Sequence, residues 1–222
     1  MCVMSIAQMA HGFLQGPYGK LQLLYSYGSR LPAADMDFLA VYDGVLSAAN
    51  MMLGRVDLWA ISMSDFRWHI QMLDPLVTEP ILTGIPVFGG SSAVARARAD
   101  LRRAVPSEAS TAYLLQRSAE AYIYAVGRTR DRRDCSQQER RLFWSNLSFS
   151  ISYWAFAHYY ATRGRGPVVL QRLLGEASNE IRELWHDVML RKKGRDQIDL
   201  QILDAWARHL LHAPAKPQSV LL

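Results

Sequence analysis

The chain has 222 residues and a formal net charge of +5, with 50% hydrophobic and 20% charged residues. This balance excludes a disordered or collagen-like chain and allows one large folded domain or two small ones. No run reaches the roughly 18 consecutive apolar positions of a membrane-spanning helix. The two cysteines, Cys2 and Cys135, form neither a disulfide framework nor a Cys-x-x-Cys metal pair. We therefore expect a cytoplasmic protein without a membrane partner.

Charge is divided unevenly along the chain. Residues 1–90 contain four Lys or Arg and seven Asp or Glu, a net charge of −3, whereas residues 91–222 contain 21 and 13, a net charge of +8. Such asymmetry suggests a division of labour between two parts of the chain. The excess of arginine in the second part suits phosphate or carboxylate recognition, or else reflects only a high-GC genome.

The first 90 residues read as strands alternating with helices. Apolar and aromatic runs bounded by Gly, Pro or Asp predict strands. They lie at residues 21–27, 36–42 and 56–61, with a final extended segment over 84–90. Helices are expected over residues 1–15, 45–53 and 66–73 and from Pro75 onward.

After residue 90 the apolar spacing becomes that of core-facing helices. We expect about five of them, over residues 93–104, 108–128, 140–162, 167–190 and 196–212. The pattern thus predicts an α/β or α+β domain over residues 1–90 and an all-α helical bundle over residues 91–222.

Aspartates stand at the start of two predicted strands, where this residue type is depleted. Asp35 and Asp37 are two positions apart, so their carboxylates project to the same side of a strand. Like charges so placed repel unless a cation lies between them, and Mg²⁺ is the natural partner of clustered carboxylate oxygens. Asp57, one residue inside the next strand, could reach the same metal as a ligand or general base. The alternatives are a polar turn after Pro32 and an ion pair of Asp57 with Arg55 or another arginine.

Gly28 and Ser29 follow the strand that precedes these aspartates. Glycine permits close backbone approach, and backbone amides with the serine hydroxyl can hold a terminal phosphate. Arg30 would add a positive charge for the same phosphate.

This ordered set resembles the nucleotidyltransferase superfamily, which includes DNA polymerase β, antibiotic nucleotidyltransferases and MNT-type antitoxins. The family motif is a hydrophobic strand, Gly-Ser, a spacer, Asp-x-Asp opening an apolar strand, and a third acidic residue on a later strand. The matching elements are Gly28-Ser29, Asp35-Met36-Asp37 and Asp57, and the resemblance covers about residues 20–90. Five residues separate Ser29 from Asp35, about half the usual spacer.

The resemblance implies an α+β fold, with a small mixed sheet followed by a helical bundle. It also implies a Mg²⁺-dependent enzyme that moves a nucleoside monophosphate from a triphosphate, with ATP favoured, to an acceptor hydroxyl and releases pyrophosphate. Asp35, Asp37 and Asp57 would be the catalytic and metal-binding residues, and Gly28, Ser29 and Arg30 would bind the nucleotide. A small-molecule acceptor is favoured. The alternatives are a tRNA or protein acceptor, or an inactive fold used as a binding module, which the short spacer suggests. The sequence does not indicate the oligomeric state.

Overall fold

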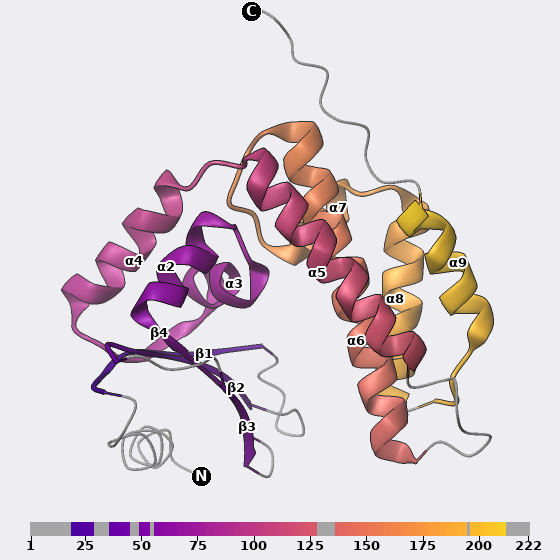
Figure 1. Ribbon diagram of the computed structural model, residues 1–222, viewed down its shortest axis with the longest axis horizontal. Coiled ribbons are helices and arrows are strands. Elements are labelled where there is room, and N and C mark those ends of the chain that lie inside the picture. Colours follow the sequence, from indigo (N-terminus) through magenta and orange to yellow (C-terminus); the bar gives the residue numbers. More distant parts are fainter. Residues whose placement is uncertain are drawn as a thin grey trace, which may run out of the picture. The chain divides into compact units, whose positions relative to one another are not determined.

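The computed structural model describes residues 19–28, 36–44, 49–53, 56–127, 136–194 and 196–211 (Figure 1). By the contacts between its residues the chain separates into two compact units, Met1–Val105 and Pro106–Leu222. A mixed sheet followed by helices confirms the expected α+β class. None of the described helices combines the length and apolar composition that a membrane span requires.

The first unit is built on a five-stranded sheet with the order β3-β4-β2-β1-β5. Strands β2 and β4 run parallel, and the other neighbouring pairs are antiparallel. The strands are β1 (Leu21–Tyr27), β2 (Met36–Tyr42), β3 (Ala49–Leu53), β4 (Val56–Ser62) and β5 (Ile85–Phe88). The sequence-based predictions for β1, β2, β4 and β5 are therefore confirmed.

Apolar side chains cover both faces of the central strands. Phe38, Ala40 and Tyr42 belong to a buried cluster on one face. Leu39 and Val41 alternate with them, are fully buried, and point to the opposite face. Helices α2 (Met63–Gln71), α3 (Pro75–Thr83) and α4 (Ser91–Arg103) pack on the sheet or on each other, and Figure 1 shows them on one side of the strands.

Local capping fixes the starts of α2 and α3. The Ser62 hydroxyl is the N-cap of α2 and accepts a hydrogen bond from the Asp65 amide at 3.0 Å. Asp74 caps α3 by accepting from the Leu76 amide at 2.9 Å, with Pro75 in the first turn. These caps place both helices directly after their preceding segments, so α2 returns over the sheet immediately after β4.

Three expectations differ from the structure. Residues 49–53 form strand β3, because antiparallel pairing with β4 overrides the helix preference of their Ala, Met and Leu residues. The unit boundary lies after Val105 instead of residue 90, because α4 packs against α2, α3 and β1. The helix expected over 167–190 is divided into two, because Ser178 accepts hydrogen bonds from the amides of Ile181 and Arg182 and so begins a new helix.

The second unit consists of helices. They are α5 (Glu108–Gly127), α6 (Gln137–Arg163), α7 (Leu170–Glu176), α8 (Asn179–Gly194) and α9 (Leu200–Leu211). The long helix α6 starts at a Ser136–Glu139 capping box and ends at Gly164, which has a φ of +58°. Its aromatic side chains are mostly buried, as Phe143, Trp144 and Tyr160 illustrate.

A buried polar contact joins α5, α6 and α9. The hydroxyls of Ser118 and Ser150 each donate to the other residue's carbonyl oxygen, at 2.7 and 2.8 Å. The Trp206 indole donates to Oγ of Ser150 at 2.7 Å. Because all three residues are fully buried, these bonds satisfy groups that would otherwise be costly inside the core.

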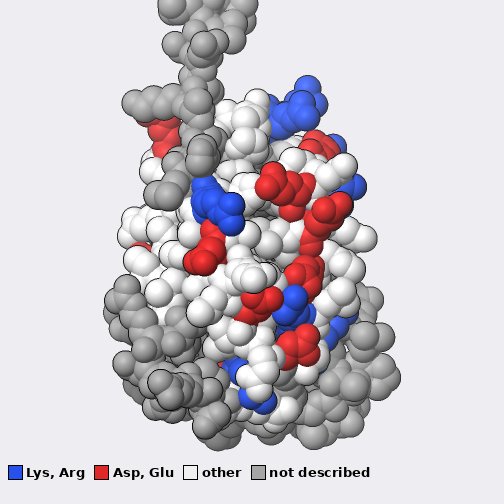
Figure 2. All heavy atoms as spheres, turned by 90° about the vertical axis from the view of Figure 1, so that its right-hand side faces the viewer, with Lys and Arg blue, Asp and Glu red and all other residues white. Residues whose placement is uncertain are grey.

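Charges of both signs alternate on the surface of the helical unit. Figure 2 shows Lys and Arg interspersed with Asp and Glu on the face it presents. Arg191 pairs with both Asp187 and Asp199 at 3.2 Å, and His209 lies 3.1 Å from Glu180. The excess positive charge of this half of the sequence therefore does not make that face uniformly basic.

Candidate active site

Two of the predicted catalytic aspartates lie side by side in the sheet. Asp37, the second residue of β2, pairs in register with Asp57, the second residue of β4. Because the strands are parallel neighbours, about 4.8 Å apart, the two side chains leave the same face of the sheet. Both residues are partly exposed. The sequence predicted that Asp57 could reach the same metal as the other two aspartates. The strand register places Asp57 beside Asp37, and the shared metal stays a prediction.

The face that carries the two aspartates is the one covered by α2. Trp59 is two residues after Asp57, so it projects to the same side. Its ring meets the His69 ring of α2 edge-on, with centroids 5.2 Å apart. On this face of β4, α2 therefore covers Trp59, and Asp57 lies two residues before it, toward the start of the strand.

Gly28 holds the end of β1 tightly against Asp37. Its φ is +82°, a conformation that favours glycine. A Cβ at this position would collide with Oδ2 of Asp37. Gly28 thus lies next to the carboxylate of Asp37. The close approach to a phosphate that the sequence predicted for Gly28 stays a prediction.

Tyr27 lies among the acidic groups at this end of the sheet. It pairs with Asp37 across β1 and β2. Burial raises the pKa of the Tyr27 hydroxyl, and the negative charges of Asp37, Asp57, Glu79 and Asp74 raise it further. The phenol therefore stays protonated at neutral pH. Glu79 of α3 and Asp74, its N-cap, thus add negative charge near Tyr27 alongside the two strand aspartates.

Asp74 links this acidic region to α2. Its side chain is completely buried, and Oδ2 lies 2.9 Å from Nδ1 of His69. The other carboxylate oxygen caps α3. Asp74 thus bonds both to the first turn of α3 and to His69 of α2, the residue that packs on Trp59. We therefore assign it a structural role, which is to hold α2 and α3 together beside the sheet.

The remaining predicted residues are Ser29, Arg30 and Asp35, and they lie outside the described part of the chain. Within that part, no three His, Cys, Asp or Glu side chains are arranged to hold a metal ion. Asp37 and Asp57 are hard oxygen donors on one face, the chemistry that Mg²⁺ prefers. The chemistry of Asp37 and Asp57 therefore fits the predicted Mg²⁺. Asp35, two residues before Asp37, remains the predicted third ligand.

Among solved structures, the chain is similar to a nucleotidyltransferase-like protein from Exiguobacterium sibiricum. The TM-score is 0.40 and the identity 15%, and the match covers 95% of this chain and 73% of that one. Protein-family models and curated protein sequences give no match. A likeness of this strength carries no functional conclusion, so the residues of the site must supply it.

Sequence reasoning assigned no site role to Tyr27, Asp74 or Glu79. Tyr27 directly precedes Gly28 and Ser29, and this position in the sequence could have marked it as a site residue. Asp74 followed by Pro75 reads as a helix start, which it is. Nothing in the local sequence marks Glu79, because only the packing of α3 beside β1 brings it near Tyr27.

Proposed function

We propose that this chain is a metal-dependent nucleotidyltransferase that moves a nucleoside monophosphate from a nucleoside triphosphate, with ATP favoured, to an acceptor hydroxyl. The observation that carries the proposal is the in-register pairing of Asp37 with Asp57, next to a Gly28 at which a Cβ would collide with the Asp37 carboxylate. Paired carboxylates beside a glycine turn suit a triphosphate and its cation.

The proposed roles follow the order of the residues in the chain. The backbone of Gly28 and Ser29, with the Arg30 guanidinium, binds the outer phosphates. Asp35 and Asp37 hold Mg²⁺, with Asp57 as a further ligand or as the general base. When bound, the cation would neutralise phosphate charge and polarise the phosphoryl oxygens.

The proposed reaction is an in-line displacement. The acceptor oxygen attacks the α-phosphorus, the bond from that phosphorus to the bridging oxygen breaks, and pyrophosphate leaves. Asp57 accepts the proton that the acceptor hydroxyl releases. The protonated Tyr27 can donate a hydrogen bond at the same end of the sheet without adding to its negative charge.

The acceptor that we propose is a small molecule. The chain has only 222 residues, and its sequence contains no recognisable nucleic-acid-binding module. On the face of the molecule in Figure 2, acidic side chains interrupt the basic ones, whereas a nucleic-acid surface is usually a continuous basic stripe.

The proposal is tested by calorimetric titration of the full chain with non-hydrolysable analogues of ATP, GTP, CTP and UTP, in Mg²⁺ and in EDTA. We expect binding that requires Mg²⁺ and is lost in Asp37→Asn. Asp43→Asn is the matched control, because Asp43 follows β2 at its far end and bonds to Lys20 and Gln22. Binding of no analogue would overturn the proposal in favour of an inactive fold.

A further inference from the structure

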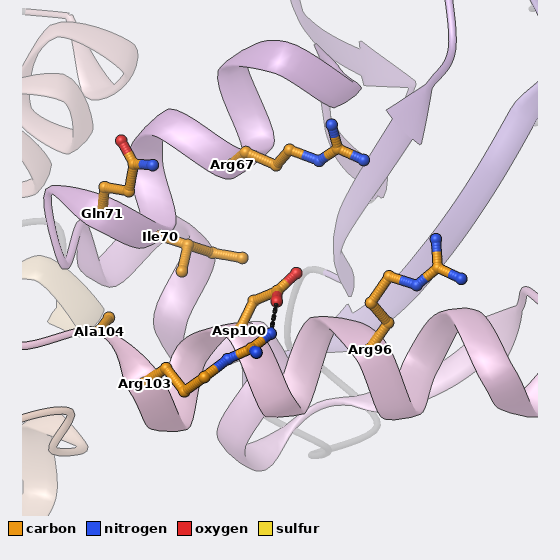
Figure 3. Close-up of a pocket in the computed structure, with 7 residues that line it drawn as sticks. All are labelled: Arg67, Ile70, Gln71, Arg96, Asp100, Arg103 and Ala104. Atoms are coloured by element: carbon orange, nitrogen blue, oxygen red, sulfur yellow. Dashed lines mark hydrogen bonds and ion pairs between the residues drawn. The ribbon is translucent and has the colours of Figure 1, made fainter.

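A second candidate site lies in the first unit, between α2 and α4, outside the catalytic residues proposed above. On α2, Arg67, Ile70 and Gln71 have i, i+3, i+4 spacing and so share one side of the helix. On α4, Arg96, Asp100 and Arg103 have i, i+4, i+7 spacing and do the same. These two rows, with Ala104, line a pocket of about 530 Å³, which we call the α2–α4 pocket (Figure 3).

The α2–α4 pocket is strongly basic for its size. It contains three arginines and one aspartate, and Arg103 is paired with Asp100. No ion pair joins Arg67 or Arg96 to an acidic side chain among the described residues. Figure 3 shows these two side chains reaching from different helices toward the same end of the pocket. The pocket is thus lined by arginines from two different helices, and neither Arg67 nor Arg96 forms an ion pair within the described residues.

The Arg103–Asp100 pair is readily exchanged. The Arg103 side chain is 75% exposed and that of Asp100 is 34% exposed, and exposed pairs of this kind contribute little to stability. A multivalent anion would therefore compete with Asp100 for Arg103 at small cost. Ile70, which is 3% exposed, supplies an apolar base to the same pocket.

We propose that the α2–α4 pocket binds a small phosphorylated molecule carrying at least two negative charges. Guanidinium groups bind phosphate oxygens through paired, charge-assisted hydrogen bonds. The volume lies within the roughly 300–1,000 Å³ of small-molecule sites. Binding depends on Arg67 and Arg96 and does not require a divalent cation, which separates it from the triphosphate site at Asp37 and Asp57.

The test is calorimetric titration of the full chain with inorganic tripolyphosphate in EDTA, at fixed ionic strength, in an Asp37→Asn background that disables the catalytic site. We expect Arg67→Gln and Arg96→Gln each to weaken binding by about tenfold, as expected for one lost charge-assisted bond. Arg102→Gln is the matched control, since it removes the same charge from an exposed position of α4 outside the pocket and should change the Kd less than about twofold.

Asp100→Asn provides a test with the opposite sign. Removal of its negative charge releases Arg103, so tripolyphosphate should bind several-fold more tightly. The proposal is overturned if the Asp37→Asn chain with its pocket residues unchanged does not bind tripolyphosphate. It is overturned equally if Arg102→Gln weakens this binding as much as Arg96→Gln does, or if Asp100→Asn weakens it. It is also overturned if a 12-nucleotide RNA binds more tightly than tripolyphosphate, which would indicate a nucleic-acid surface.

Discussion

Asp37 and Asp57 occupy matching second positions on the parallel strands β2 and β4 and pair directly across the sheet. Two carboxylates that face each other on neighbouring strands repel when both are ionised. A cation bound between them, or a proton on one of them, removes this repulsion. Asp37 is also the residue against which Gly28 is packed. The two aspartates are therefore equivalent in register but differ in their surroundings, and we expect them to differ in function.

The first prediction separates the two roles. Asp57→Asn should change the Kd of the Mg²⁺–ATP analogue less than about tenfold, whereas the rate of pyrophosphate release from ATP, with water as acceptor, should fall by about 10²–10⁴-fold, as for loss of a general base. Steady-state pyrophosphate release and calorimetry measure the two quantities. A large loss of nucleotide affinity in Asp57→Asn would instead make Asp57 chiefly a metal ligand.

Strands whose signal is local could be predicted from the sequence. β1 and β2 are apolar runs closed by glycine or aspartate, and their bounds match the prediction. β3 could not, because Ala49–Leu53 has helix-forming residues and becomes a strand only through its pairing with β4. The capping serine at residue 178 is likewise a weak signal inside an apolar pattern typical of one long helix.

The same distinction applies to the candidate site. Asp37 and Asp57 could be proposed because aspartate is unusual in strands, but their register depends on which strands are neighbours. Glu79 and Asp74 carry local roles in α3, and their effect on Tyr27 arises only when that helix packs beside β1. Long-range packing thus explains the residues that local patterns missed.

The second prediction concerns the glycine beside Asp37. Gly28→Ala should lower the free energy of unfolding by about 1–2 kcal/mol, because a side chain is disfavoured at positive φ. It should also abolish Mg²⁺-dependent nucleotide binding, because the new Cβ displaces the Asp37 carboxylate. Urea denaturation and calorimetry measure these effects. In the control Gly175→Ala, the added Cβ meets nothing within 4 Å, and unchanged binding in both variants would contradict the prediction.

The third prediction concerns pH. Burial raises the pKa of Tyr42 above its usual value of 10.0, and the pKa values of Tyr25 and Tyr27 are raised as well. The folded state therefore keeps these protons where the unfolded chain loses them. Their contribution to stability is complete below pH 10 and declines as the pH rises above it. The free energy of unfolding, measured by urea denaturation from pH 8 to 11, should fall at the alkaline end.

Tyr42→Phe should reduce this alkaline loss. The Tyr42 hydroxyl is buried and has no hydrogen-bond partner among the described residues, so its removal at pH 7 should leave stability unchanged or raise it by about 1 kcal/mol. Tyr124→Phe is the control, because the Tyr124 side chain is 64% exposed. A steeper alkaline decline in Tyr42→Phe than in Tyr124→Phe would show that Tyr42 is not a source of the pH dependence.

The fourth prediction tests the buried polar contact of the helical unit. Ser150→Ala removes the acceptor of the Trp206 indole and the donor to the Ser118 carbonyl. Because the Trp206 indole N–H is then buried without a partner, the free energy of unfolding should fall by about 1–3 kcal/mol. Tryptophan fluorescence during urea denaturation measures the change. Thr162→Ala, which removes an exposed hydroxyl bonded to the His158 carbonyl in the same helix, should cost less than about 0.5 kcal/mol, and equal losses in the two variants would mean that the Ser150 network adds no stability.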